Sequence, residues 1–74
     1  MVNACILIKV VPVRLNRVLE ELRKVKGVVK VYPTYGRFDA VCLVEGSTNE
    51  DIAEISAVIN RLEGVRSTET LIEA

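Results

Sequence analysis

The chain is 74 residues long, half of its residues are apolar, and ten basic and ten acidic side chains leave no net charge. This length predicts one domain, and a lone domain of this size is only marginally stable. The large apolar share therefore indicates that a partner chain covers part of the surface. Zero net charge argues against a general electrostatic attraction to nucleic acid. Because no stretch fits a signal peptide or a membrane span, we expect a cytoplasmic protein without a membrane partner.

Basic and acidic residues are separated along the sequence. Residues 1–37 carry eight Lys or Arg and two Glu, whereas residues 38–74 carry two Arg and eight Asp or Glu. We expect this polarity to act within the fold or between subunits, because opposite charges attract and fix orientation. A basic patch for an acidic partner is the second interpretation.

The two halves of the sequence repeat each other with an offset of 37 residues. Apolar residues recur in steps of three and four after Pro12 and again after Ser47, which predicts one amphipathic helix in each half. Ser47 followed by Glu50 fits a capping box. Gly27 and Gly64 are predicted to end the helices in a left-handed conformation. The matched pairs are Leu15 and Ile52, Val18 and Ile55, Leu22 and Ile59, Val25 and Leu62, Gly27 and Gly64, and Val28 and Val65.

Four apolar or β-branched runs predict strands at Val2–Val11, Val28–Thr34, Ala40–Glu45 and Val65–Ile72. The resulting βαββαβ order predicts the ferredoxin-like arrangement of the α+β class. In this arrangement a four-stranded antiparallel sheet carries both helices on one face, and the second and fourth strands are its edges. Pro33 fits an edge strand, because proline cannot donate a hydrogen bond to a neighbouring strand.

The first and third strands are apolar at both odd and even positions. Such strands are buried on both faces of a sheet. Because the helices cover one face, we expect a second copy of the chain to cover the other, as a homodimer packed sheet to sheet.

Residue types for most enzymatic and metal chemistry are missing. The chain has no His, no nucleophile motif and no glycine-rich phosphate loop, so we expect no catalysis, metal or cofactor. The central strands carry no aromatic ring to stack RNA bases. Cys5 and Cys42 lie in strand-like runs and are expected to be buried free thiols, although a disulfide between them is the alternative.

The segment between the second and third strands reads Tyr35, Gly36, Arg37, Phe38 and Asp39. A hairpin turn has use for Gly36, and Asp39 can bond its own backbone there. The turn does not explain Tyr35, Arg37 and Phe38. These three residues either cover a helix end or subunit interface or contact a ligand.

Two threonines, Thr68 and Thr70, alternate in the last strand and therefore point to one face. Threonine suits an edge strand, which is one explanation of the pair. The other is a pair of hydroxyls directed at one small polar ligand.

The order and spacing of these features resemble the RAM domain, the effector-binding C-terminal module of the Lrp/AsnC family of transcription regulators. The resemblance covers essentially the whole chain. Family members commonly show a G-x-x-D turn before the third strand, which here is Gly36–Asp39. They also show a leucine-glycine-valine stop and then T-x-T or T-x-S, which match Leu62–Val65 and Thr68–Thr70.

The resemblance implies dimers made by sheet-to-sheet packing, rings of such dimers that often number four, and an amino acid or related metabolite between dimers. It implies that the turn Tyr35–Asp39 supplies backbone donors, with Asp39 for an ammonium group and Arg37 for a carboxylate. Thr68 and Thr70 would be the facing hydroxyls. Charged ligand groups need such partners once water is excluded.

Full-length members also carry an N-terminal helix-turn-helix that binds DNA, whereas this sequence opens at its first strand. It therefore resembles a stand-alone RAM module over residues 1–74, and no direct nucleic-acid binding is expected. Such a module senses a metabolite, or joins a full-length regulator and changes its oligomeric state. The alternative function is an oligomerisation module without a ligand.

Overall fold

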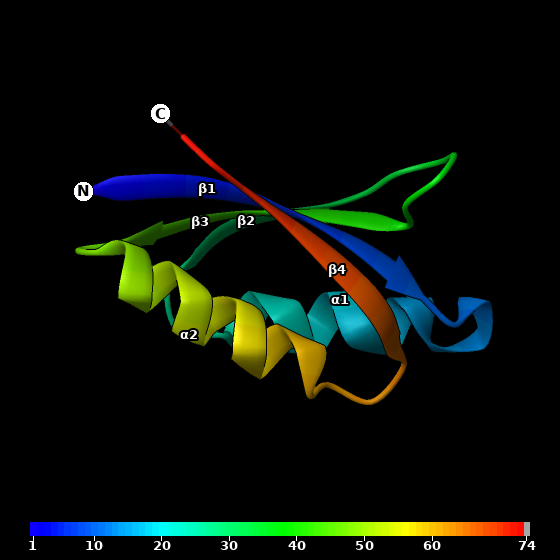
Figure 1. Ribbon diagram of the computed structural model, residues 1–74. Helices are drawn as coiled ribbons and strands as arrows, with labels where there is room; N and C mark the ends of the chain where they lie inside the picture. The colour runs from blue at the N-terminus through cyan, green and yellow to red at the C-terminus, as the bar shows by residue number, and fades with distance from the viewer. Residues whose placement is uncertain (74) are drawn as a thin grey trace.

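The computed structural model describes residues 1–73 and has the predicted βαββαβ order (Figure 1). Four strands form one antiparallel sheet, both helices lie on the same face of it, and a short 3-10 turn leads into the first helix. The elements are β1 (Val2–Val10), the 3-10 turn η1 (Pro12–Arg14), α1 (Leu15–Lys24), β2 (Val28–Pro33), β3 (Ala40–Gly46), α2 (Asn49–Asn60) and β4 (Val65–Ile72).

The strand order in the sheet is β2-β3-β1-β4, so β2 and β4 are the edges, as predicted. The pairing of each edge strand carries an irregularity. The pairing of β2 with β3 shifts between Val28 and Lys30, and the pairing of β1 with β4 shifts between Lys9 and Val10. Such bulges bend a strand and increase its twist. The strong twist makes β4 cross the direction of the other strands when the sheet is viewed along its edge (Figure 1).

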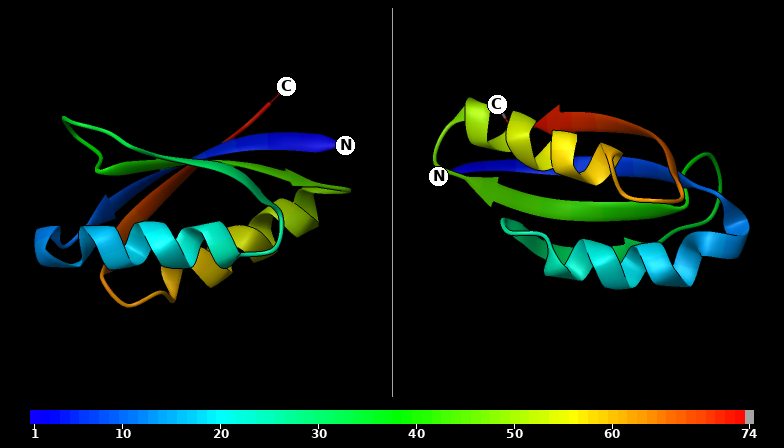
Figure 2. Two further views of the ribbon diagram at one scale, coloured as in Figure 1. Left: turned by 180° about the vertical axis from the view of Figure 1, so that it is seen from behind. Right: turned by 90° about the horizontal axis from the view of Figure 1, so that it is seen from below.

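Both helices lie against one face of the sheet (Figure 2). One hydrophobic core fills the space between them and the sheet. Every second residue of β1 and β3 points into it, and each helix contributes one apolar stripe. The buried residues are Ala4, Ile6, Ile8, Val10, Val18, Leu19, Leu22, Ala40, Cys42, Val44, Ile52, Ile55 and Ile59. Full burial of an aliphatic side chain stabilises the fold by about 1.5–3 kcal/mol. No polar or charged residue among residues 1–73 is buried, so this layer is held by apolar packing.

The capping box of α2 begins one residue later than the sequence analysis predicted. Thr48, not Ser47, is the N-cap, and its hydroxyl accepts a hydrogen bond from the backbone N–H of Asp51 at 3.2 Å. The Asp51 carboxylate in turn accepts from the backbone N–H groups of Thr48 at 3.2 Å and Ser47 at 2.9 Å. Glu50 is exposed and takes no part. The short Asp side chain can close this ring, which satisfies donors that the helix start leaves free.

Both glycines after the helices have the predicted left-handed backbone, with φ of +96° at Gly27 and +100° at Gly64. The helices themselves end earlier, at Lys24 and Asn60. The glycines therefore reverse the chain into the following strand. Within residues 1–73, no helix is long and apolar enough to cross a membrane.

Candidate functional site

The loop between β2 and β3 is closed at its base by hydrogen bonds. The backbone N–H of Thr34 donates to the carbonyl of Asp39 at 3.0 Å, and the Thr34 hydroxyl donates to the carbonyl of Phe38 at 2.9 Å. Gly36 has φ of +115°, a conformation that glycine adopts without steric cost. The sequence prediction of a turn that requires Gly36 is therefore confirmed.

Asp39 joins this loop to the central strand β1. Its backbone N–H donates to the carbonyl of Ile8 at 2.9 Å, and its carboxylate oxygen Oδ2 accepts from the backbone N–H of Val10 at 2.8 Å. We expected Asp39 to bond the backbone of its own turn, and that expectation was wrong. The partner lies 29 positions away in the sequence, because β3 pairs with β1 and brings the two segments together.

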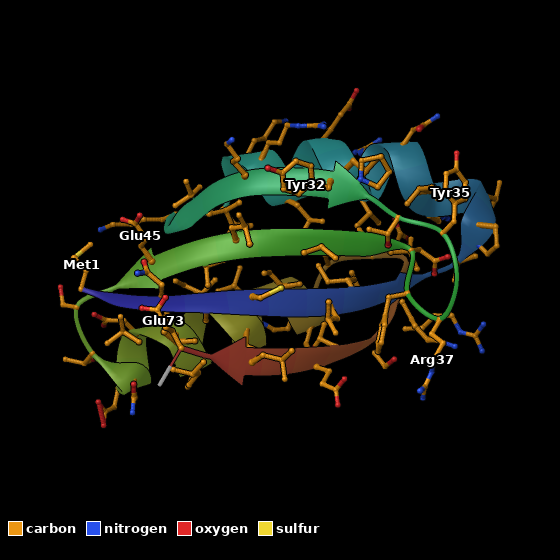
Figure 3. All side chains as sticks on the ribbon, turned by 90° about the horizontal axis from the view of Figure 1, so that it is seen from above. Met1, Tyr32, Tyr35, Arg37, Glu45 and Glu73 are labelled. Atoms are coloured by element: carbon orange, nitrogen blue, oxygen red, sulfur yellow. The ribbon has the colours of Figure 1, made fainter. Side chains whose placement is uncertain are left out.

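The side chains at the tip of the loop extend away from the rest of the molecule. Tyr35 and Arg37 project beyond the end of the sheet (Figure 3). Tyr35 is completely exposed, at 103% of its reference area, and Arg37 is also exposed, whereas Phe38 and Asp39 are half-buried. An exposed tyrosine beside an exposed arginine is typical of a contact surface, because both residue types are enriched at binding hot spots.

Thr68 and Thr70 do point to one face of β4, and this is the face covered by α2. The Thr68 hydroxyl accepts a hydrogen bond from the side-chain amide of Asn60 at 2.9 Å. The Thr70 and Ser56 hydroxyls are 3.2 Å apart and share a hydrogen bond. Sequence reasoning missed Ser56 and Asn60. Their spacing of four on the flank of a predicted helix was the available signal, because it places them on one side.

The structure does not bring the two threonines and the Tyr35–Asp39 loop together within one chain. Thr68 is paired with Ile8, which is in turn paired with Ala40 at the start of β3. Two strand spacings, or about 10 Å, therefore separate Thr68 from that end of the loop. The predicted site residues form two separate groups, one at the loop and one between α2 and β4.

The sheet face opposite the helices is largely apolar. Cys5, Leu7 and Val41 are half-buried near its centre, and Leu43 and Leu71 are exposed. Lys9, Lys30, Glu45, Glu69 and Glu73 surround this area. A shallow hollow of about 480 Å³ lies on this face between β2 and β4, with Glu45 and Glu73 at one end (Figure 3). Hereafter we call this surface the open sheet face.

Cys5 and Cys42 are both free thiols, as expected, but only Cys42 is buried, whereas Cys5 is half-buried. They lie on adjacent strands, but Cys5 points to the open sheet face and Cys42 into the core. Burial raises the pKa of the Cys42 thiol to about 11, with a smaller contribution from the neighbouring Cys5. Cys42 is therefore an inert core residue at neutral pH. Across the described residues, no three His, Cys, Asp or Glu side chains cluster as metal ligands would.

Comparison with known proteins gives one consistent family. The model of the Lrp/AsnC ligand binding domain matches residues 3–73. The HTH-type transcriptional regulator FL11 of Pyrococcus furiosus is 33% identical over 69 residues, which make up 93% of this chain and 46% of that protein. The chain thus spans about half the length of this relative.

Solved structures share the fold of this chain over its whole length. TTHA0845 from Thermus thermophilus superposes with a TM-score of 0.95 at 32% identity, covering 100% of this chain and 94% of that one. The hypothetical protein PHS023 from Pyrococcus horikoshii gives a TM-score of 0.89 at 29% identity, covering 100% of this chain and 90% of that one.

More distant structures show the fold alone. Escherichia coli AsnC has a TM-score of 0.89 at 23% identity, covering 97% of this chain and 50% of that one. The siroheme decarboxylase NirDL has a TM-score of 0.89 at 19% identity, covering 99% of this chain and 25% of that one, so the same fold also occurs within an enzyme. Because the family model spans nearly all of the described residues, the chain belongs to the Lrp/AsnC ligand-binding domain family of transcription regulators.

Proposed function

We propose that this protein is a regulatory module that binds a small effector, an amino acid or a related metabolite, and acts in transcription regulation through its oligomeric assembly. The observation that carries the proposal is the match of residues 3–73 to a ligand-binding domain of transcription regulators. The HTH-type transcriptional regulator FL11, which is 33% identical over 69 residues, supports a role in transcription regulation.

The open sheet face supports assembly as a homodimer. The molecule measures 34 × 21 × 17 Å, so its broad face offers roughly 700 Å², near the ~800 Å² per partner of a stable interface. The centre of the face is apolar and its edges carry both signs of charge, which resembles the core and rim of an interface. A second copy would cover Cys5, Leu7 and Leu43. Such dimers would then assemble further, with four of them making an octamer.

The effector site would lie between chains, because its two halves are apart within one chain. Tyr35, Gly36, Arg37, Phe38 and Asp39 would come from one copy. Thr68 and Thr70, together with Asn60, would come from another. In Asp39, the oxygen Oδ2 already accepts from Val10, so the second carboxylate oxygen has more acceptor capacity left for an ammonium group.

The test is the unfolding of the purified protein in denaturant, with each of the twenty amino acids added in turn. A ligand that binds only the folded state adds about 2.7 kcal/mol at 100 times its dissociation constant. One clear increase would name the effector class. The Thr68→Val and Tyr35→Ala variants should then lose this increase while the dimer remains. Val13→Ala is the matched control, because Val13 is 88% exposed and belongs to neither group.

The second candidate function is an assembly module that binds no effector. One observation favours it, namely that the Thr68 and Thr70 hydroxyls already have partners on α2. If this candidate is correct, the protein forms oligomers, and no amino acid changes their stability. A defined increase with one amino acid, lost in Thr68→Val, would exclude it.

A further inference from the structure

The open sheet face has one basic edge and one acidic edge. Lys30 lies on this face of β2, because it pairs with Leu43 of β3, whose side chain belongs to the same face. Glu69 and Glu73 lie on this face of β4, at positions that alternate along the strand with Leu71. Since β2 and β4 are the outer strands, roughly three strand spacings, or about 14 Å, separate the two edges (Figure 3).

These charges continue the polarity seen along the sequence, in which residues 1–37 are mainly basic and residues 38–74 mainly acidic. The basic edge comes from the first of these halves and the acidic edge from the second. Lys30, Glu69 and Glu73 have no ion-pair partner within residues 1–73. A second copy of the chain carries the matching pattern, because it offers an acidic edge to the basic one and a basic edge to the acidic one.

Symmetry leaves few ways for a second copy to cover this face. The two copies of a closed dimer are related by a twofold axis, which for two facing sheets lies between them. Packed sheets align their strands to within about 30° or cross them at nearly 90°. Aligned strands allow two directions of the axis, along the strands or across them. Crossed strands are the third arrangement.

Crossed strands would bury too little surface. The molecule measures 34 × 21 × 17 Å, and its longest dimension follows the strands, since the nine residues of β1 alone span roughly 30 Å. Two such faces crossed at a right angle overlap over roughly 440 Å², about half of the ~800 Å² per partner of a stable interface. Aligned strands keep the whole face in contact and are therefore favoured.

An axis across the strands would bring like charges together. Each strand would then face the same strand of the second copy, so the edge with Lys30 would lie over its own counterpart, and so would the edge with Glu69. An axis along the strands instead places β2 of each copy over β4 of the other. Opposite charges then meet at both edges. Because complementary charges fix the orientation of an interface and like charges oppose it, the axis along the strands is favoured.

The register of the sheet brings particular side chains together in this arrangement. Lys30 pairs with Leu43, which pairs with Cys5. Cys5 pairs with Leu71, so Lys30 and Leu71 lie at the same level of the sheet. An axis along the strands keeps this level and places Lys30 beside Glu69 of the partner subunit. Facing sheets lie about 10 Å apart, a distance that a lysine and a glutamate side chain span together.

We propose that the protein dimerises about a twofold axis along its strands, with Lys30 of each copy in contact with Glu69 of the partner subunit. This inference rests on the proposed homodimer and adds which edges meet. It does not depend on an effector. The separation of charge along the sequence then has a role, because it selects one of the two aligned orientations.

Charge reversal tests the contact through the dimer dissociation constant, measured by sedimentation equilibrium at low salt. Lys30→Glu and Glu69→Lys each replace two attractive pairs with two repulsive ones, which should raise the dissociation constant roughly tenfold. The double variant should return close to the parent value, because opposite charges again meet. Rescue within one chain is excluded by the distance between the edges. High salt should reduce these differences, since it screens exposed charges.

Matched controls make the same chemical changes on the helix side of the molecule. Lys26→Glu and Glu54→Lys alter exposed residues beside the two helices and should leave the dissociation constant unchanged. Lys30 and Glu69 are also exposed, so their variants should fold, which circular dichroism would verify.

Coupling with a water-soluble carbodiimide reports the contact directly. This reagent joins a lysine amine to a carboxylate in contact with it through an amide bond. We expect a covalent dimer whose linked peptides, identified by mass spectrometry, contain Lys30 and Glu69. Lys30→Arg keeps the positive charge but has no amine to couple, so the dimer should persist while this link disappears.

The possible failures are distinguishable. A dimer whose dissociation constant neither single reversal changes would overturn the orientation and leave the proposed homodimer intact. Single reversals that weaken the dimer without rescue in the double variant would show that the two residues do not face each other, which also rejects the proposal. A parent protein that stays monomeric would contradict the homodimer together with its orientation.

Discussion

The carboxylate of Asp39 accepts a hydrogen bond from the backbone N–H of Val10 at 2.8 Å and thereby fixes the β2–β3 loop to the end of β1. The next residue, Val11, donates its backbone N–H to the carbonyl of Gly64 at 2.8 Å. The end of β1 therefore links the loop that carries Tyr35 and Arg37 to the turn that precedes β4. Any contact made by the loop acts on a rigid base, since Asp39 is bonded through both its backbone and its side chain.

Replacement of this carboxylate should destabilise the fold. Asp39→Ala leaves the N–H of Val10 without its acceptor in a half-buried position, which costs about 1–3 kcal/mol. Asp39→Asn keeps an oxygen acceptor and should cost less. Urea unfolding at one fixed protein concentration would measure both variants. If the alanine variant were as stable as the parent protein, the carboxylate would not be what holds the loop.

The start of α2 offers a test that distinguishes two adjacent hydroxyl residues. Thr48→Ala removes the N-cap acceptor of Asp51 and should cost about 1 kcal/mol. Ser47→Ala should be close to neutral, because only the backbone of Ser47 takes part in the cap. The comparison of the two free energies of unfolding is the measurement. If Ser47→Ala were the more destabilising of the two variants, Ser47 would be the N-cap, as the sequence pattern predicted.

The buried thiol of Cys42 makes stability depend on pH in the alkaline range. Its pKa is raised from 9.0 to about 11 in the folded state, so the unfolded chain loses this proton first as the pH rises. The stability that the protonated Cys42 thiol contributes is fully present below pH 9 and is lost as the pH rises towards 11. Between these values stability should fall by roughly 1 kcal/mol per pH unit from this group.

The control is Cys42→Ala, which removes this thiol and leaves every other side chain in place. The cavity in Cys42→Ala lowers stability at every pH, so the slopes are compared and not the absolute values. Equal slopes in the two proteins would show that Cys42 does not ionise on unfolding in this range.

The open sheet face should be the dimer interface. Leu43 is 37% exposed near the middle of β3, so Leu43→Glu places a charge in the proposed interface without disturbing the core. We expect this variant to sediment as a monomer at micromolar concentration, because an unpaired carboxylate is costly to bury. Val13→Glu makes the same chemical change at an exposed position outside the sheet and should remain a dimer. A monomeric parent protein would contradict the proposed assembly.

Local sequence patterns predicted most of the fold. Steps of three and four located both helices, and Gly27 and Gly64 have the predicted left-handed backbone, although the helices end before them at Lys24 and Asn60. Pro33 identified β2 as an edge strand, and β2 lies at the edge. These features follow from short-range geometry, namely the period of the helix and the backbone limits of glycine and proline.

The capping-box pattern located the start of α2 less accurately, because two neighbouring residues both fit it. Ser47 and Thr48 each precede an acidic residue by three positions, and Ser47 was the predicted cap. Thr48 is the cap because the helix starts at Asn49 and turns Ile52, Ile55 and Ile59 toward the sheet. Packing of the apolar stripe therefore fixed the start of the helix more narrowly than the capping pattern did.

The candidate site depended much more on tertiary structure. The sequence alone determined that Gly36 lies in a turn and that Thr68 and Thr70 share one face of a strand, because both facts concern neighbouring residues. Only the folded chain decided that Asp39 bonds to Val10 and that the two threonines bond to α2. Strand pairing and helix packing join residues that are far apart in the sequence, and no local periodicity specifies which partners they will meet.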